Sequence, residues 1–431
     1  MANDEAFTGE EALDPAAQLF HAQRLNCYIV TIVGFKTKIN PNVIKAGLEH
    51  TLLKHPLFCS KIKVDEKEGR NMKWTRTTVR LENHVIVPNL DPDIKNSDQF
   101  VEDYVSNLTK NAMDMSQPLW ELHLLNIKTS DAEAVGVFRS PPLNWLICNT
   151  SVDFMLFVAT FFFLKDTQSP IKGAPRCDLT TKRFVYRIVS LDDIRLVKNV
   201  TNTTVNDVVL GVTQAGLSRY LDRRYAEDEK DGGARQNNNN IPESIRLRAI
   251  VFSNIRPTAG IQAMAEMMKK GSKDKWGNEI GFVIVPLTIA LHGDPLDYIE
   301  RAKAKMERKK LSLEARCTFP FSNYVLKTFG VKAAAALTHT VFTNTTVAFS
   351  NVVGPLEEIS FIGHPIAFLA PSIYGFPHAI TIHCQSYVNK MTIILAVDPN
   401  VVPHPHQLLD DIEESLQLIK DAALKRRSSK I

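Results

Sequence analysis

Short runs of β-branched and apolar residues alternate along this chain with longer segments whose apolar residues recur at helical spacing, and this alternation most constrains the fold. It excludes a purely helical or purely β architecture and predicts a mixed α/β class. Strands are expected at 27–37, the end of 114–127, 134–138, 246–252, 280–290, 346–354, 378–388 and 391–398, and helices at 40–55, 96–113, 189–200, 203–225, 295–315 and 405–424.

A stretch rich in Pro, Gly and Thr, residues 165–183, interrupts this alternation and indicates a boundary between two lobes. The expected division is an N-terminal lobe over 1–165, a linker over 166–185 and a C-terminal lobe over 186–431. Within the second lobe, residues 226–244 are polar and of low complexity, which predicts a mobile surface loop.

Composition argues against several functional classes. The 431 residues carry 51 Lys and Arg against 47 Asp and Glu, and without a long basic stripe a nucleic-acid partner is not expected. The six cysteines are scattered without a C-x-x-C pair, so neither a zinc site nor a disulfide framework is indicated, and no metal is expected. The acidic, polar first 15 residues do not resemble a signal peptide.

Residues 143–164 form a strongly apolar segment, with 16 apolar residues of 22. Its length would suit a membrane span, but Asp153 near the centre costs about 2.5–3.5 kcal/mol on insertion scales. The remaining apolar run, 154–164, has the length of an interfacial or a buried helix. Contact with a membrane surface and a place in the protein core therefore both stay open.

Motifs with a strong mechanistic signature are absent from the sequence, including nucleotide-binding glycine loops, the nucleophile elbow and H-E-x-x-H. His404 and His406 lie among prolines just before a helix, without a nearby third ligand, so metal binding is not indicated. His383 lies on a predicted strand and is interpreted as a residue satisfied within a sheet, with a catalytic role as the less favoured alternative.

The start of the helix predicted at 203–225 carries a second local signal. Thr204 and Asp207 match a capping box with Asp in place of Glu, in which the threonine bonds a backbone N–H and the carboxylate favours the positive helix end. The capping box does not explain Asn206, a poor helix former whose amide could face a binding site.

Four stretches in the expected order resemble the plant wax ester synthase/diacylglycerol acyltransferases over nearly the whole chain. They are the N-terminal stretch 11–30, Gln-Pro-Leu-Trp at 117–120, Val-Asn-Asp-Val-Val-Leu-Gly at 205–211 and Ser-Asn-Val-Val-Gly-Pro at 350–355. The resemblance implies the α+β two-lobe fold of CoA-dependent acyltransferases such as chloramphenicol acetyltransferase. It also implies transfer of an acyl group from acyl-CoA to a fatty alcohol or diacylglycerol, with no bound cofactor.

The resemblance further implies a membrane surface as partner, at the endoplasmic reticulum on its cytosolic face or at the plasma membrane. It points to eight residues at or beside the substrate site, each with a structural alternative. The Leu-Trp pair could pack the lobe interface as well as line an acyl channel, the Gly-Pro pair could be a strand-ending turn, and capping accounts for part of the Asn-Asp pair. The eight residues are Pro118, Leu119, Trp120, Asn206, Asp207, Asn351, Gly354 and Pro355.

One family motif is missing from this chain. In the family, a strand resembling 133–139 is followed by His-His-x-x-x-Asp-Gly, whose second histidine is taken as the general base. Here the chain continues with Ser-Pro-Pro. Because residues 153–173 resemble the family closely again, an internal deletion near residue 140, which truncates the N-terminal lobe, is predicted. No histidine lies between His123 and His292 to take over locally. His123 is the nearest conceivable substitute base, but alternation along its strand leaves its direction open, so the role is not assigned to it.

The missing motif bears directly on activity. General-base catalysis contributes typically about 10²–10⁴-fold to a rate, so a chain without the motif is expected to turn over weakly or not at all. No catalytic residue is assigned for that reason. The alternative function is that of a non-enzymatic, splice-type relative that binds lipid or an intact paralogue.

Overall fold

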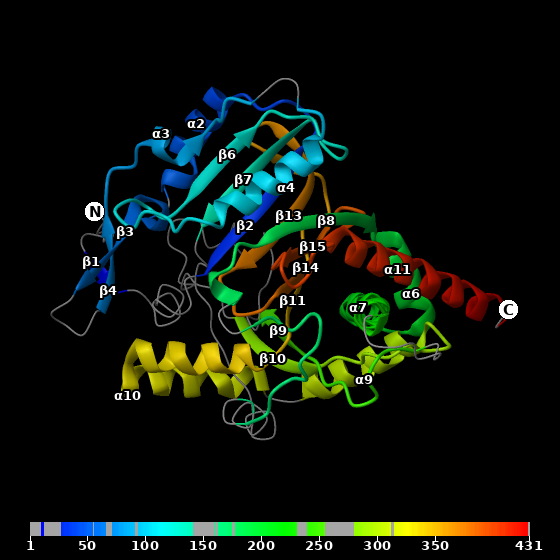
Figure 1. Ribbon diagram of the computed structural model, residues 1–431. Coiled ribbons are helices and arrows are strands. Elements are labelled where there is room, and N and C mark those ends of the chain that lie inside the picture. Colours follow the sequence, from blue (N-terminus) through cyan, green and yellow to red (C-terminus); the bar gives the residue numbers. More distant parts are fainter. Residues whose placement is uncertain are drawn as a thin grey trace, which may run out of the picture.

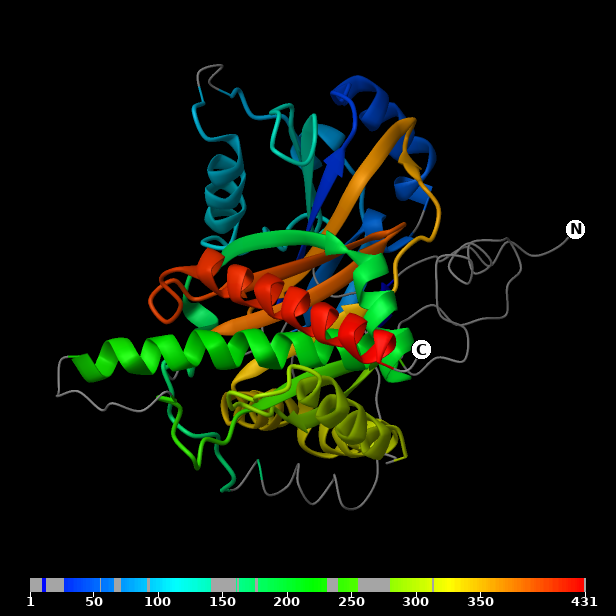
Figure 2. The same cartoon turned by 90° about the vertical axis from the view of Figure 1, so that its right-hand side faces the viewer.

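Two six-stranded sheets, packed against each other, organise the computed structural model of the chain (Figures 1 and 2). A three-stranded sheet, β1-β4-β3, adds Ile62 and Trp74 to the core of the first sheet. The described residues are 10–12, 27–54, 56–65, 71–90, 94–140, 160, 163–174, 177–230, 239–254, 280–311 and 314–429.

The first sheet has the strand order β12-β13-β2-β7-β6-β5, and its pairings are antiparallel except for β5 with β6. Side chains alternate between its faces. One face packs on α2, and the other packs on α4 and the second sheet. The elements of this half and of the small sheet are β1 Glu10–Ala12, β2 Tyr28–Phe35, α2 Pro41–His50, β3 Ser60–Asp65, β4 Asn71–Arg76, α3 Leu81–His84, β5 Val85–Ile86, α4 Ser97–Leu108, β6 Glu121–Leu125, β7 Ala134–Ser140, β12 Ser360–Phe361 and β13 His364–Tyr374.

The second sheet has the order β10-β9-β11-β14-β15-β8, with β11 parallel to both of its neighbours. Helices α7, α9 and α11 pack on one face, and α10 packs on the other (Figure 1). Its elements are β8 Arg183–Ser190, α6 Leu191–Thr201, α7 Val205–Lys230, β9 Arg248–Asn254, β10 Ile280–Pro286, α9 Asp297–Leu311, α10 Glu314–Thr343, β11 Val347–Val352, β14 Ile380–Tyr387, β15 Lys390–Val397 and α11 Pro405–Ser428; short 3-10 turns lie at Leu52–Lys54, Pro56–Cys59 and Cys177–Leu179.

Strand β13 crosses from the second half of the chain into the first sheet. It pairs with β2 from Ile366 opposite Phe35 to Tyr374 opposite Tyr28, whereas β14 begins at Ile380 in the middle of the second sheet. The sheet pairing therefore differs from the expected lobe boundaries. Periodicity identifies a strand but carries no information about which distant strand it will pair with.

Further expected boundaries differ from the structure. Strand β8 begins at Arg183, inside the predicted linker 166–185. Helix α7 continues to Lys230, and the backbone N–H of Asn240 donates to Asp222 at 2.7 Å, so both ends of the predicted mobile loop are held in place. The middle of that loop, 231–238, lies outside the described residues.

The apolar segment predicted at 143–164 also lies outside the described residues, except for Thr160, Phe163 and Leu164. Within the described ranges, no helix combines the length and the apolar character that crossing a membrane requires. The helix predicted at 96–113 is confirmed as α4. Asn96 caps it by accepting a hydrogen bond from the backbone N–H of Gln99 at 3.1 Å.

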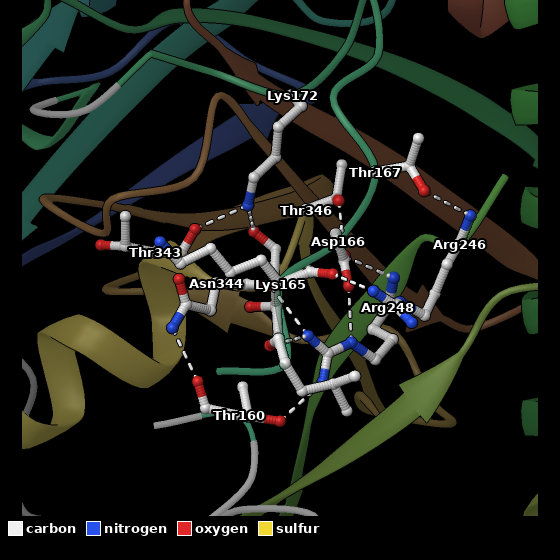
Figure 3. Close-up of polar contacts among 12 residues, drawn as sticks. Thr160, Lys165, Asp166, Thr167, Lys172, Arg246, Arg248, Thr343, Asn344 and Thr346 are labelled. Atoms are coloured by element: carbon white, nitrogen blue, oxygen red, sulfur yellow. Dashed lines mark hydrogen bonds and ion pairs between the residues drawn. The ribbon is translucent and has the colours of Figure 1, made fainter. Parts of the chain in front are cut away.

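A buried ion pair between Asp166 and Arg248 fixes the chain near Asp166 to strand β9 (Figure 3). Arg248 of β9 donates from Nε to Asp166 Oδ1 at 2.5 Å, and both side chains are almost fully buried. Its two other nitrogens donate to the Thr160 hydroxyl and to the carbonyls of Leu164 and Asn344. Every nitrogen of the guanidinium thus has a partner, which is the condition under which burying an ion pair is tolerated.

Replacing Asp166 with Ala would leave the Arg248 charge buried without its counterion. We expect Asp166→Ala to lower the free energy of unfolding by about 3–5 kcal/mol, measured by urea unfolding. The matched control is Glu300→Gln, which removes the exposed Arg426–Glu300 pair at 2.6 Å and should cost less than about 1 kcal/mol. Equal stability of the two variants would contradict the prediction.

A second ion pair joins the two halves of the chain at the surface. His406, in the first turn of α11, lies with Nε2 2.9 Å from Glu102 Oε1 of α4. The hydrogen bond and the charge of Glu102 outweigh burial and raise the pKa of His406 above its ordinary value. Arg183 lies 3.5 Å from the same carboxylate and opposes the protonation.

This raised pKa predicts a pH-dependent contribution of His406 to stability. Below about pH 6.5 the imidazolium is present in both states and the pair stabilises the folded chain; the contribution is lost as pH rises through the raised folded pKa. Wild type and His406→Gln should therefore differ in melting temperature near about pH 5.5 and converge near about pH 8.5. A difference that does not shrink with rising pH would show that His406 acts by packing.

Candidate active site

The family resemblance places the missing motif directly after strand β7. This strand lies inside the first sheet, between β2 and β6, rather than at the edge of the sheet. Ser140 is the last residue of β7. In the row just before it, Glu121 of β6, Arg139 of β7, Val30 of β2 and Ser372 of β13 are in register. Register partners point to the same face of a sheet, so these four side chains share one face.

Arg139 anchors this end of β7 through its buried guanidinium. Its Nη1 lies 3.4 Å from Glu121 Oε2, and its Nη2 donates to the carbonyl of Asn111. The guanidinium carbon lies 4.9 Å from the ring centre of Tyr28 and 5.9 Å from that of Tyr374, within the range of cation–π attraction. The last residues of β7 are therefore held rigidly.

His123 belongs to the same cluster. Its Nδ1 lies 2.8 Å from the Tyr104 hydroxyl and its Nε2 lies 3.4 Å from Glu121 Oε2, so both ring nitrogens are engaged. Burial would raise the pKa of Glu121, but the hydrogen bond to His123 and the charge of Arg139 together hold that pKa below its ordinary value. The imidazole therefore has a structural role, because its hydrogen bonds are made within the protein and the ring is buried.

His383 of β14 is the histidine that lies where the two sheets meet. Its Nδ1 lies 3.3 Å from the hydroxyl of Ser372, which belongs to β13 of the first sheet. The sequence predicts a histidine whose hydrogen bonds are satisfied within the sheet. The structure agrees for Nδ1 only, because Nε2 has no hydrogen-bond partner within the described part of the chain. The side chain is partly accessible to solvent, yet burial lowers its pKa to about 4.

The structure brings two of the eight predicted residues into direct contact. Asn351 at the end of β11 donates from Nδ2 to Asn206 Oδ1 at the start of α7, so two motifs 145 positions apart meet. The capping box is confirmed beside this pair. Asp207 Oδ2 accepts from the backbone N–H of Thr204 at 2.8 Å and from its hydroxyl at 2.7 Å, and the Asp207 N–H donates to the hydroxyl at 3.3 Å.

Gly354 and Pro355 follow the end of β11 at Val352; no turn is formed at these two residues, and the segment is seated on the end of β14. The Gly354 N–H donates to Ser386 Oγ at 3.0 Å, and the Pro355 carbonyl accepts from the backbone N–H of Val388 at 2.8 Å. A Cβ on Gly354 would lie 1.9 Å from the carbonyl oxygen of Ser386. Glycine is therefore required here by close approach of the two backbones.

Pro118, Leu119 and Trp120 are buried, and Leu119 and Trp120 lie in different cores. Leu119 packs with residues of both sheets, as the lobe-interface alternative expects. Trp120 lies in the core of the first lobe, stacked on His84 with ring centres 4.5 Å apart, and its Nε1 donates to the Phe58 carbonyl at 3.0 Å. These contacts give the Leu-Trp pair a packing role, and no described contact joins it to the Asn206–Asn351 pair.

The cluster of Glu121, His123 and Arg139 was not foreseen from the sequence. The signal that could have found it is the spacing of Glu121 and His123, which alternation places on one face of a strand, together with Arg139 at the end of the neighbouring strand. Across the described ranges, no group of His, Cys, Asp and Glu is arranged to hold a metal ion.

Comparison with known proteins identifies the family. A family model described as the WS/DGAT C-terminal domain matches residues 276–420. Wax ester synthase/diacylglycerol acyltransferase 4 of Arabidopsis thaliana is 46% identical, with 98% of this chain and 92% of the relative covered. Wax ester synthase/diacylglycerol acyltransferase 6 of the same plant is 45% identical, with 99% of this chain and 96% of the relative covered. The chain belongs to the wax ester synthase/diacylglycerol acyltransferase family.

Solved structures show the same fold. A wax ester synthase/diacylglycerol acyltransferase from Marinobacter aquaeolei VT8 superposes with a TM-score of 0.61 at 18% identity, covering 96% of this chain and 99% of that chain. The first condensation domain of the CDA synthetase and a trichothecene 15-O-acetyltransferase from Fusarium sporotrichioides each give 0.57, covering 95% or more of both chains. The expected two-lobe acyltransferase fold is confirmed.

The alignments with relatives also reveal a difference in length within this family. Those with Arabidopsis proteins 4 and 6 run over 487 and 497 positions, more than the 431 residues of this chain. These relatives therefore carry internal residues that have no counterpart here.

Replacing Gly354 tests how firmly the segment after β11 is seated. Gly354→Ala forces this segment away from Ser386 and should lower the free energy of unfolding by about 1–3 kcal/mol. Gly293→Ala is the matched control, because a Cβ there meets nothing within 4 Å. Urea unfolding of both variants measures the difference, and a Gly354→Ala protein as stable as the control would contradict the close approach.

Proposed function

We propose that this chain is an acyl-CoA-dependent O-acyltransferase, which transfers a fatty acyl group to a fatty alcohol or diacylglycerol and so makes wax esters or triacylglycerol. The observation that carries the proposal is 41–46% identity, over 97–99% of the chain, to Arabidopsis proteins named for these two activities. Acyl-CoA is the co-substrate. No bound cofactor is needed, because the thioester already activates the acyl carbon.

The reaction needs a group that accepts the proton of the acceptor hydroxyl. An alcohol at neutral pH is a poor nucleophile, and a base positioned beside it is worth typically about 10²–10⁴-fold. The resemblance assigns that base to the second histidine of His-His-x-x-x-Asp-Gly, which this chain lacks after Ser140. We therefore propose a slow enzyme rather than one with the turnover of its longer relatives.

We place the internal deletion at the junction just after Ser140. Two observations support this position. The alignments with relatives contain more positions than this chain has residues, and the sequence resembles the family on both sides of the junction. The motif would follow directly from β7, whose last residues are held by Arg139.

A membrane surface is the proposed location, at the endoplasmic reticulum on its cytosolic face or at the plasma membrane. Both acceptors partition into lipid, so the enzyme must reach them at a bilayer surface. Val353 and Leu356, which flank Gly354 and Pro355, are 76% and 71% exposed. Apolar side chains exposed beside the Asn206–Asn351 pair support contact with lipid there.

The missing motif favours a second candidate function. A chain with no base would still keep the fold and the packed lobe interface. It could then act as a non-enzymatic relative, shortened as a splice variant would be, that binds lipid or an intact paralogue. The two candidates differ in one measurable property, which is turnover.

The deciding experiment measures ester formation from labelled palmitoyl-CoA with hexadecanol or diacylglycerol. We expect the folded chain to form ester about 10²–10⁴-fold more slowly than Arabidopsis protein 4. A chimera that carries the segment of that relative after Ser140 should recover most of this loss. A folded chimera that forms ester no faster than wild type would show that the deletion lies elsewhere. A folded wild type that forms no ester would favour the second candidate function, binding without turnover.

A further inference from the structure

The slow activity proposed above needs a proton acceptor among the residues this chain retains. Such a group must face the same side of the first sheet as the end of β7, where the reaction would occur. It must also have a basic atom free of other hydrogen bonds, and an orientation fixed by a neighbour.

Three buried histidines in the described part of the chain fail these conditions. His123 has both nitrogens engaged by Tyr104 and Glu121. His84 is buried, with Nδ1 2.7 Å from the Trp120 carbonyl and its ring stacked on that side chain.

His378 fails for a different reason. It is 1% exposed, its Nε2 lies 2.9 Å from the Thr345 hydroxyl, and burial holds its pKa well below the ordinary value. A ring enclosed on all sides cannot reach an alcohol.

His383 meets the conditions through its contact with Ser372. In the first sheet, Ser372 of β13, Val30 of β2 and Arg139 of β7 are in register. Two strand spacings, about 10 Å, therefore separate Ser372 from Arg139, the residue before the last of β7. The ring comes from the second sheet and reaches this face between the lobes. Its Nε2 has no partner among the described residues, and the side chain is partly accessible.

We propose that His383 is the general base of the residual acyl transfer in this chain. With Nδ1–H donating to Ser372 Oγ, the lone pair of Nε2 is free to accept the proton of the acceptor hydroxyl. The alcohol oxygen attacks the thioester carbonyl, the carbon–sulfur bond breaks, and the imidazolium returns the proton to the departing thiolate. Ester and free CoA are the products, so atoms and charges balance.

The environment of His383 also explains why this base would be slow. Burial is the cause that lowers its pKa to about 4; Arg139 and Glu121 lie on the same face of the first sheet but pair with each other. At neutral pH the imidazole is therefore fully in the base form but weakly basic. Proton transfer is most efficient when the pKa lies near the working pH. A base of this kind gives catalysis below that of an ordinary histidine.

The test compares His383→Gln with His123→Gln, using labelled palmitoyl-CoA and hexadecanol. Glutamine keeps a polar group toward Ser372 but cannot take up the proton. We expect His383→Gln to lower the rate by about 10-fold or more, whereas His123→Gln keeps it, with both variants melting cooperatively. The wild-type rate should stay level between about pH 6 and pH 8, because the base is deprotonated throughout that range.

The outcomes separate this inference from the proposed function on which it rests. Ester formation that survives in His383→Gln, or a wild-type rate that falls with an apparent pKa near about 6.5, would overturn the role of His383 and leave the acyltransferase intact. No ester from folded wild type would overturn both. Loss of ester formation in His123→Gln alone would transfer the role of base to the cluster of Glu121, His123 and Arg139.

Discussion

Strand β13 is the constraint on which the arrangement of the two sheets depends. It runs the length of β2 in the first sheet, and a short connection then leads into β14 at the centre of the second. Gly375 makes this corner with a φ of 94°, in the region that favours glycine. With so short a connection the sheets cannot separate, and the contact between Ser372 and His383 is set by the chain itself.

Two buried arginines hold the chain, one at the end of β7 and the other near Asp166. Arg139 fixes the end of β7 between aromatic rings and Glu121, and Arg248 fixes Thr160 and the residues after it through Asp166. Guanidinium groups suit this task because five donors in a rigid plane can bond several acceptors at once. The two anchors belong to different sheets, Arg139 to the first and Arg248 to the second.

Elements with a strong local signal were predictable from the sequence. Asn96 caps α4 where expected, the Thr204–Asp207 box starts α7, and β7 begins at Ala134. The mixed fold and the family followed from the same patterns together with the motifs. The site was less predictable, because the candidates were chosen by motif, and among the described contacts only the one between Asn206 and Asn351 joins two different motifs. The pairing of β13 with β2 and of His383 with Ser372 depends on contacts between distant residues, which local propensity does not encode.

The pairing of β2 with β13 also sets the order in which this protein can fold. Tyr28 meets Tyr374, so a central strand of the first sheet waits for a partner synthesised more than 300 residues later. During synthesis one edge of β2 stays unpaired, and such edges invite association with other chains. Contacts so distant in sequence also slow folding. The N-terminal half of this chain is therefore not an independent folding unit, and its sheet closes only after most of the second sheet has left the ribosome.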